Sequence, residues 1–180
     1  MKMIFGLIVL TLPQLLMAVT DSHYSGQESR SIKSLSKQDI EALKKGDGMG
    51  FAKAAELNHY PGPKHVLDLA DELELTPSQR ASTTALYNDM RNNAIPLGQE
   101  ILRAEEELDL LFSSGAANAE SLRTTLLHIG QLRAKLRFVH LEAHLRQRKI
   151  LSPYQAGEYD NLRGYQDHAR HRDRNTHDEK

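Results

Sequence analysis

Two histidines, His140 and His144, stand four residues apart in the stretch "HLEAH". On a helix this spacing puts both imidazole rings on one side, close enough to share a transition-metal ion. Glu142 lies between them in the sequence but about 200 degrees around the helix from His140, so it points away. The stretch therefore differs from the H-E-x-x-H signature of zinc proteases, in which the glutamate follows the first histidine directly. The pattern predicts a metal-binding pair and argues against a hydrolase.

Further ligands must come from other parts of the chain, and the candidates are Asp89, Met90, His59 and His65. If the chain turns near Gly115 between two antiparallel helices, residues near 90 lie opposite residues near 140, which favours Asp89 and Met90. His59 and His65 bracket a Tyr-Pro-Gly-Pro turn and would reach the pair if this segment folds back over the helices. These ligand types suit zinc, nickel, cobalt or copper, and no motif for an organic cofactor is present.

Each of these residues also has a plainer interpretation. The histidine pair follows Val139 at the edge of an apolar seam, where imidazoles are often only solvated or hydrogen-bonded. Met90 occupies a seam position, and methionine commonly fills gaps in a core. His168, His171 and His177 belong to a charged tail without apolar periodicity, predicted to be disordered over residues 166–180 and to bind metal loosely at most.

Two long apolar seams would position the pair. The first comprises Leu86, Met90, Ala94, Leu97, Ile101, Ala104, Leu108 and Leu111, and the second Leu122, Leu126, Ile129, Leu132, Leu136, Val139 and Ala143. Spacings of three and four residues predict amphipathic helices, and the short Ser-Gly-rich loop between them predicts antiparallel neighbours. Pro96 and Gly98 are expected to kink the first helix. No stretch alternates with period two, so the sequence predicts an all-α fold, a long kinked antiparallel hairpin whose thin core favours a homodimer.

Shorter helices are expected before the hairpin. Ser36 and Asp39 can cap one that ends at the Gly46-Asp47-Gly48 cluster, a second covers roughly 49–57, and a third, amphipathic one covers 64–75. Two similar pentads, Leu75-Thr76-Pro77-Ser78-Gln79 and Leu151-Ser152-Pro153-Tyr154-Gln155, follow. In each, Thr or Ser suits the N-cap, Pro the first helical position, and Gln the reciprocal position of a capping box. Each pentad is therefore predicted to end one helix and start the next.

The N-terminus has the layout of an export signal. Lys2 precedes a short apolar run that Pro13 interrupts, and Ala18 suits a cleavage site, so we expect a signal peptide over 1–18. A retained membrane anchor is the alternative. Residues 19–36 are polar and predicted to form a flexible leader, and residues 37–165 the helical domain. The chain has no cysteine to form a disulfide, and its net charge of −1 does not favour nucleic acid as a partner.

The paired pentads around a helical hairpin, with the lead-in "LNHYPGPKHVLDLADELEL", resemble the LTXXQ group. This group includes the Spy/CpxP periplasmic chaperones and the ZraP- and CnrX-type heavy-metal proteins, and the resemblance covers roughly residues 48–165. It implies a non-enzymatic, usually dimeric, curved hairpin protein of the periplasm. CnrX-like members carry a metal-binding histidine with a methionine four residues later, and here the second position is His144.

Three functions follow from this resemblance. The first is metal sensing or resistance through reversible metal binding that adjusts an envelope stress response. The second is a metal-independent, ATP-independent chaperone that holds unfolded periplasmic proteins. Clustered acids near Glu105 and bases near Arg137, beside apolar faces, favour such a role unless these charges only solvate the helices. The third is an adaptor that docks on a membrane sensor or an anti-sigma protein. No enzymatic constellation is present.

Overall fold

The computed structural model describes residues 22–165. Its six helices are α1 (Lys37–Lys45), α2 (Lys53–Glu56), α3 (Pro63–Asp68), α4 (Pro77–Ser113), α5 (Ala119–Ile150) and α6 (Pro153–Arg163), and no strand occurs among these residues. The predicted all-α class and the long antiparallel hairpin are confirmed. The expected signal peptide over 1–18 and the expected tail over 166–180 lie outside the described residues.

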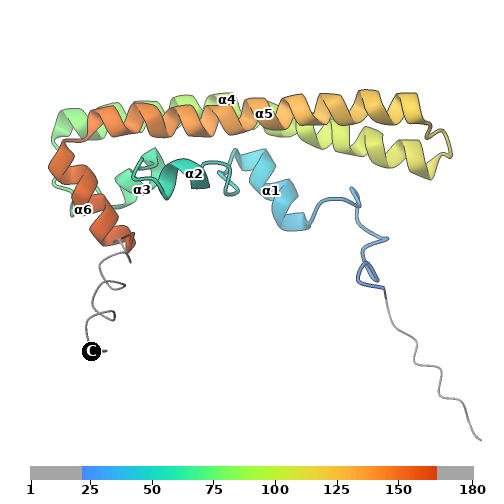
Figure 1. The fold of residues 1–180 in the computed structure, drawn as a ribbon, viewed down its shortest axis with the longest axis horizontal. Helices are drawn as coiled ribbons and strands as arrows, with labels where there is room; N and C mark the ends of the chain where they lie inside the picture. The colour runs from blue at the N-terminus through green and yellow to red at the C-terminus, as the bar shows by residue number, and fades with distance from the viewer. Residues whose placement is uncertain (1–21, 166–180) are drawn as a thin grey trace, which may run out of the picture.

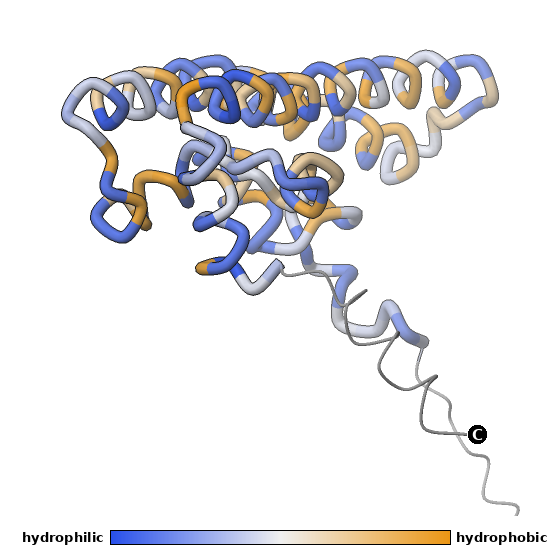
Figure 2. Tube along the Cα trace, turned by 60° about the vertical axis from the view of Figure 1, so that its left-hand side comes forward, coloured by the Kyte–Doolittle hydropathy of each residue, from blue (hydrophilic) through white to orange (hydrophobic). Residues whose placement is uncertain are grey.

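Helices α4 and α5 form the long hairpin, and the four short helices lie along one side of it (Figure 1). Apolar and polar residues alternate around both long helices, as Figure 2 shows. The facing sides bury Ala94, Ile101, Leu132 and Leu136 in one core cluster. Asn118 caps α5 after the turn at Gly115, which has the left-handed φ of 73°. Helix α4 runs on through Pro96, so the predicted kink stays a prediction, as does the dimer.

Helix α1 packs against the middle of α4. Its capping box joins Ser36 and Asp39 and its C-cap is the left-handed Gly46, as predicted. Leu43 inserts into the hairpin core and is 1% exposed. Opposite it, Gly98 is buried, and a Cβ built on Gly98 would lie 2.1 Å from the Leu43 carbonyl oxygen. Gly98 therefore lets the α1 backbone approach α4 more closely than any other residue would.

The segment before α1 is part of the packed structure, which corrects the expected leader. Ile32 and Leu35 are buried in the same cluster as Leu43. Ser34 donates a hydrogen bond to Glu105 at 2.8 Å, and Glu105 also accepts one from Arg133 at 2.7 Å. The polar composition of residues 19–36 predicts a flexible leader, but it does not take account of Ile32 and Leu35, the two apolar residues that anchor this segment. The packed domain begins before residue 37.

Two short helices are shorter than the sequence predicts. The expected helix over 49–57 is reduced to α2, and that over 64–75 to α3, after which the chain turns. Glu74 has a positive φ of 49° within this turn. The turn places Leu73 and Leu75 in a second core cluster with Val66, Leu151 and Tyr159. Burial of these side chains against α6 prevails over the local helical periodicity.

The two pentads meet in space. Each forms the predicted capping box, Thr76 with Gln79 on α4 and Ser152 with Gln155 on α6. Beyond this, the two glutamine side chains bond to each other, at 2.8 Å from Gln79 Nε2 to Gln155 Oε1 and at 3.1 Å in the reverse direction. Gln79 also donates to the Ile150 carbonyl and Gln155 to the Leu73 carbonyl. We call Gln79 and Gln155 the glutamine clasp, because they tie the start of α4 to the start of α6.

No helix within residues 22–165 combines the length and the apolar character that crossing a membrane requires.

Candidate metal centre

The two histidines of α5 line one small cavity between the hairpin and the short helices. The cavity measures about 120 Å³ and is bounded by Met90 and Tyr87 from α4, by His65 from α3, and by the loops around Gly48 and Gly62. Four of the six predicted ligands, His140, His144, Met90 and His65, therefore share its walls. Because His140 and His144 are one helical turn apart, both face this space.

His144 is held by the proline-rich turn before α3. Its Nδ1 lies 2.7 Å from the Tyr60 carbonyl oxygen, and because a carbonyl only accepts, Nδ1 carries the proton and Nε2 keeps its lone pair. Pro61 and Pro63 on either side of Gly62 are both buried. A Cβ on Gly62 would lie 2.9 Å from His144 Nε2, so only glycine lets the turn close over the ring. The turn thus fixes the tautomer that a metal ligand needs.

His140 is the more deeply buried of the pair, at 3% exposure. Its Nε2 is buried and has no hydrogen-bond partner among the described residues, and its ring stacks on Phe51 with centroids 6.1 Å apart. Burial, and secondly the charge of a protonated His144, lower the pKa of His140 to about 4. His140 is therefore a neutral imidazole at physiological pH, the form that binds metal.

Glu56 connects His144 to the C-terminal helix. Its Oε2 lies 3.6 Å from His144 Nδ1 and has no hydrogen-bond partner in the described structure, whereas its Oε1 accepts hydrogen bonds from Tyr159 and Tyr165. Burial lowers the pKa of His144, while the bond to Tyr60 and the charge of Glu56 oppose this shift. Burial and the bond to Glu56 raise the pKa of Tyr159. Nothing in the sequence distinguished Glu56 from the other surface acids, because its role depends on α6 folding back.

Two predicted ligands do not reach the cavity. Asp89 lies on another side of α4, where its carboxylate pairs with Arg146 at 2.6 Å and also accepts from Asn93. One residue along a helix is a rotation of about 100 degrees, which separates Asp89 from Met90. His59, with a positive φ of 67°, turns toward α6 and contacts Asp160 at 2.8 Å. Within residues 22–165, no three His, Cys, Asp or Glu side chains are placed to hold a metal ion together.

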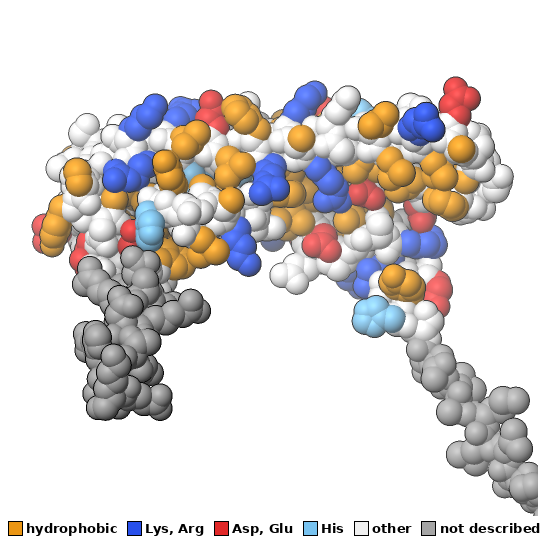
Figure 3. All heavy atoms as spheres, in the orientation of Figure 1, with side chains coloured by type: hydrophobic (Ala, Val, Ile, Leu, Met, Phe, Trp, Pro, Cys, Tyr) orange, Lys and Arg blue, Asp and Glu red, His pale blue; other side chains and the backbone are white. Residues whose placement is uncertain are grey.

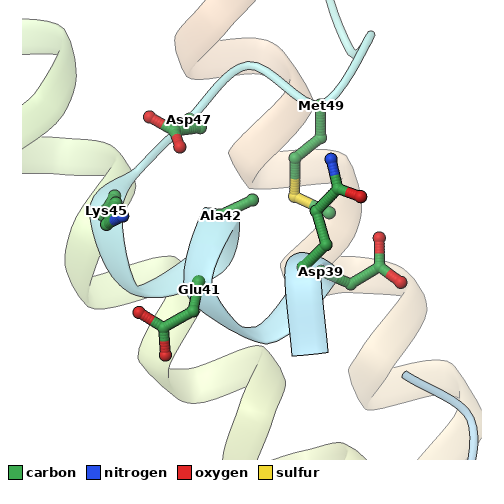
Figure 4. A pocket seen from close by; sticks show the side chains of 7 residues that line it. Asp39, Glu41, Ala42, Lys45, Asp47 and Met49 are labelled. Atoms are coloured by element: carbon green, nitrogen blue, oxygen red, sulfur yellow. The ribbon is translucent and has the colours of Figure 1, made fainter. Parts of the chain in front are cut away.

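A second, wider hollow opens beside α1 and the loop that follows it (Figure 4). It measures about 430 Å³, and its labelled residues include Asp39, Glu41, Asp47 and Met49. The Asp39 carboxylate is already occupied by the capping box, and hydrogen bonds from Ser36 lower its pKa. This hollow lacks buried unpartnered polar atoms of the kind found at His140, so the histidine cavity is the better candidate site.

The burial of His140 predicts a pH-dependent stability. Unfolding exposes the ring and returns its pKa toward 6.5, so between pH 6.5 and pH 4 the unfolded chain binds more protons than the folded chain. The free energy of unfolding should therefore fall by about 2 kcal/mol between pH 7.5 and pH 5 through this residue. His140→Leu should remove that part of the loss, as measured by urea unfolding at both pH values with a chelator present.

His128 on the same helix is exposed and provides the control. His128→Leu removes a histidine without opening or filling the cavity. A His140→Leu protein that loses as much stability on acidification as the wild type would contradict the burial of a neutral ring.

The chain matches no family model, no curated protein and no solved structure.

Proposed function

We propose that the protein binds a transition-metal ion at His140 and His144 and acts in heavy-metal sensing or resistance in the periplasm, where binding modulates an envelope stress response. The observation that supports this most directly is the buried Nε2 of His140, which has no hydrogen-bond partner in the described structure, on a side chain that borders the cavity shared with His144. A buried polar atom without a partner costs about 1–3 kcal/mol. A metal ion would satisfy this nitrogen.

The ligand set points to copper among the candidate ions. Two imidazoles are suitable for zinc, nickel, cobalt and copper alike, but Met90 lines the same cavity and its thioether is a soft ligand. His65 also borders the cavity, where its ring contacts Asp68 at 3.5 Å, so the nitrogen ligands closest to hand are the two imidazoles of α5. Cu(I) prefers such a mixture of nitrogen and sulfur. The expected order of affinity is therefore copper above zinc, nickel and cobalt.

Calorimetric titration of the purified protein with Cu(I), Zn, Ni and Co tests this proposal. We expect one ion to bind per chain. The affinity should fall by at least about a hundredfold in His140→Ala/His144→Ala, because both nitrogen ligands are removed. Met90→Leu should weaken Cu(I) more than Zn, since it removes only the thioether. Asp89→Ala, which alters the Arg146 pair outside the cavity, is the matched control and should bind all ions as the wild type does.

Truncation after Tyr165 distinguishes the cavity from the histidine-containing tail. Binding that survives truncation and disappears in the double variant supports the cavity. Absence of binding, or binding that disappears only with the tail, would contradict the proposal.

One observation favours the chaperone as a second candidate. At the turn end of the hairpin, Leu110 and Phe112 of α4 and Leu126 of α5 are 63%, 63% and 53% exposed. Large apolar side chains exposed in this way can contact partly unfolded chains. If no metal binds, suppression of aggregation of a denatured client protein becomes the deciding measurement. Loss of that suppression in Leu110→Ser/Phe112→Ser would support this function.

A further inference from the structure

Helix α5 carries a second apolar stripe, of which four of the five side chains are exposed in the described structure and the fifth, Leu141, is half-buried. We define the outer stripe as Leu127, Ala134, Phe138, Leu141 and Leu145. Leu127, Phe138 and Leu145 are 62%, 62% and 51% exposed. Apolar and basic side chains lie side by side along the hairpin face turned to the viewer in Figure 3. An exposed row of large apolar side chains on a helix indicates an interaction surface.

The outer stripe has the spacing of a helix-packing seam. Its members are separated by seven, four, three and four residues, which is the heptad pattern of coiled coils. At 3.6 residues per turn they fall within an arc of about 60 degrees, on the opposite side of α5 from the buried Leu132 and Leu136. The stripe from 127 to 145 is about 28 Å long at 1.5 Å per residue. Helix α5 can therefore pack against α4 on one side and another helix on the other.

The charges beside the outer stripe restrict its partner. Five basic residues of α5 form no salt bridge within residues 22–165, namely Arg123, Lys135, Arg137, Arg148 and Lys149. The acidic residues of this helix are only Glu120 and Glu142. The stripe thus lies in a positive field that favours acidic flanks on whatever covers it.

A second copy of the chain is a poor match for this surface. Antiparallel pairing of two stripes about Leu136 would place Arg137 opposite Lys135 and Arg123 opposite Lys149, and parallel pairing would place each base against its own equivalent. Like charges across a helix pair are destabilising. The exposed side of α4 offers large apolar residues only at Leu110 and Phe112, near the turn. Neither long helix of a second copy therefore complements the stripe.

We propose that the outer stripe is a docking site for an amphipathic helix with acidic flanks, contributed by a different protein. The apolar side of that helix packs on Phe138 and its neighbours, and its carboxylates meet the basic residues beside the stripe. The site lies on the opposite side of α5 from the core and does not use the histidine cavity, so it stands independently of metal binding.

A peptide probe tests this docking site. The probe is a fluorescein-labelled peptide about four heptads long, with leucine at the a and d positions and glutamate at e and g, which repels its own copies. Fluorescence anisotropy with the full chain should show saturable binding that weakens as salt rises. The same peptide with lysine at e and g should not bind.

Variants of exposed positions identify the surface without risk to the core. Phe138→Ala/Leu145→Ala should weaken binding of the acidic peptide by about tenfold or more, because truncating central apolar contacts has the largest effects. Lys135→Glu/Arg137→Glu should weaken the acidic peptide and allow the lysine peptide to bind. Leu126→Ala, which is exposed but lies about 100 degrees from the stripe, should change nothing.

Two outcomes would overturn the proposal. The first applies if sedimentation shows that the wild-type chain is a monomer. In that case, the proposal is wrong if the acidic and lysine peptides bind equally well, or if neither peptide binds. The other is a wild-type dimer that dissociates in Phe138→Lys, since a second copy would then cover the stripe.

Discussion

Gln155→Leu is expected to lower the free energy of unfolding by about 3 kcal/mol. The substitution keeps a similar volume but leaves the Leu73 carbonyl and the Gln79 side chain without the partners that Gln155 provides, and Gln155 itself is 9% exposed. Buried groups that lose their hydrogen bonds retain the cost of desolvation. Urea unfolding followed by far-UV circular dichroism measures the loss.

A double-mutant cycle separates the clasp from ordinary capping. Gln79→Leu should cost a similar amount, and the double variant less than the sum of the two, with a coupling of about 1–2 kcal/mol. Ser121→Ala is the matched control, because Ser121 accepts a hydrogen bond from the Asn118 amide in an exposed capping box without a partner helix. It should cost at most about 1 kcal/mol. A Gln155→Leu loss no larger than that of Ser121→Ala would show that the pairing contributes nothing.

Gly98→Ala is expected to destabilise the protein by about 2 kcal/mol, although alanine is the better helix former. The added methyl group would lie 2.1 Å from the Leu43 carbonyl oxygen and 2.8 Å from its carbonyl carbon. These are backbone atoms, so the substitution must push α1 away from α4 and withdraw Leu43 from the core. Overpacking of this kind outweighs the gain in helix propensity of about 1 kcal/mol.

Gly130 in helix α5 is expected to show the opposite effect, stabilisation by alanine. A Cβ built there meets nothing within 4 Å, so Gly130→Ala should stabilise the protein by about 0.5–1 kcal/mol. Thermal unfolding of both variants under the same conditions measures the difference in sign. If both substitutions stabilise, α1 does not approach α4 as closely as described.

The hairpin could be predicted because the sequence features that specify it involve residues close together in the chain. Caps such as Ser36 with Asp39 depend on neighbours in the sequence, and the apolar seams of α4 and α5 repeat over many turns. The segment 69–75 could not be predicted in this way, because its helical spacing yields to burial of Leu73 and Leu75 against Tyr159 of a distant helix. The same is true of Ile32 and Leu35, whose burial depends on the groove that α1 and the hairpin form.

The same distinction between local and long-range features applies to the candidate site. Spacing on one helix was enough to predict that His140 and His144 share a side. The opposing helix can be predicted from the sequence only to within a residue or two, so the candidates include both Met90, which lines the cavity, and Asp89, which pairs with Arg146 outside it. The Tyr60 carbonyl and Glu56 reach His144 through chain turns that no local pattern encodes. Contacts between distant segments are the part that required the structure.

The glutamine clasp joins positions 76 residues apart using only neutral amides and backbone carbonyls. A disulfide could close a loop of this size, but thiols react with oxidants and with soft metal ions. The clasp has no group that ionises in the physiological range and none that changes oxidation state. The closure of the fold is thereby chemically inert, and the ionisable imidazoles of His140 and His144 lie in the cavity instead.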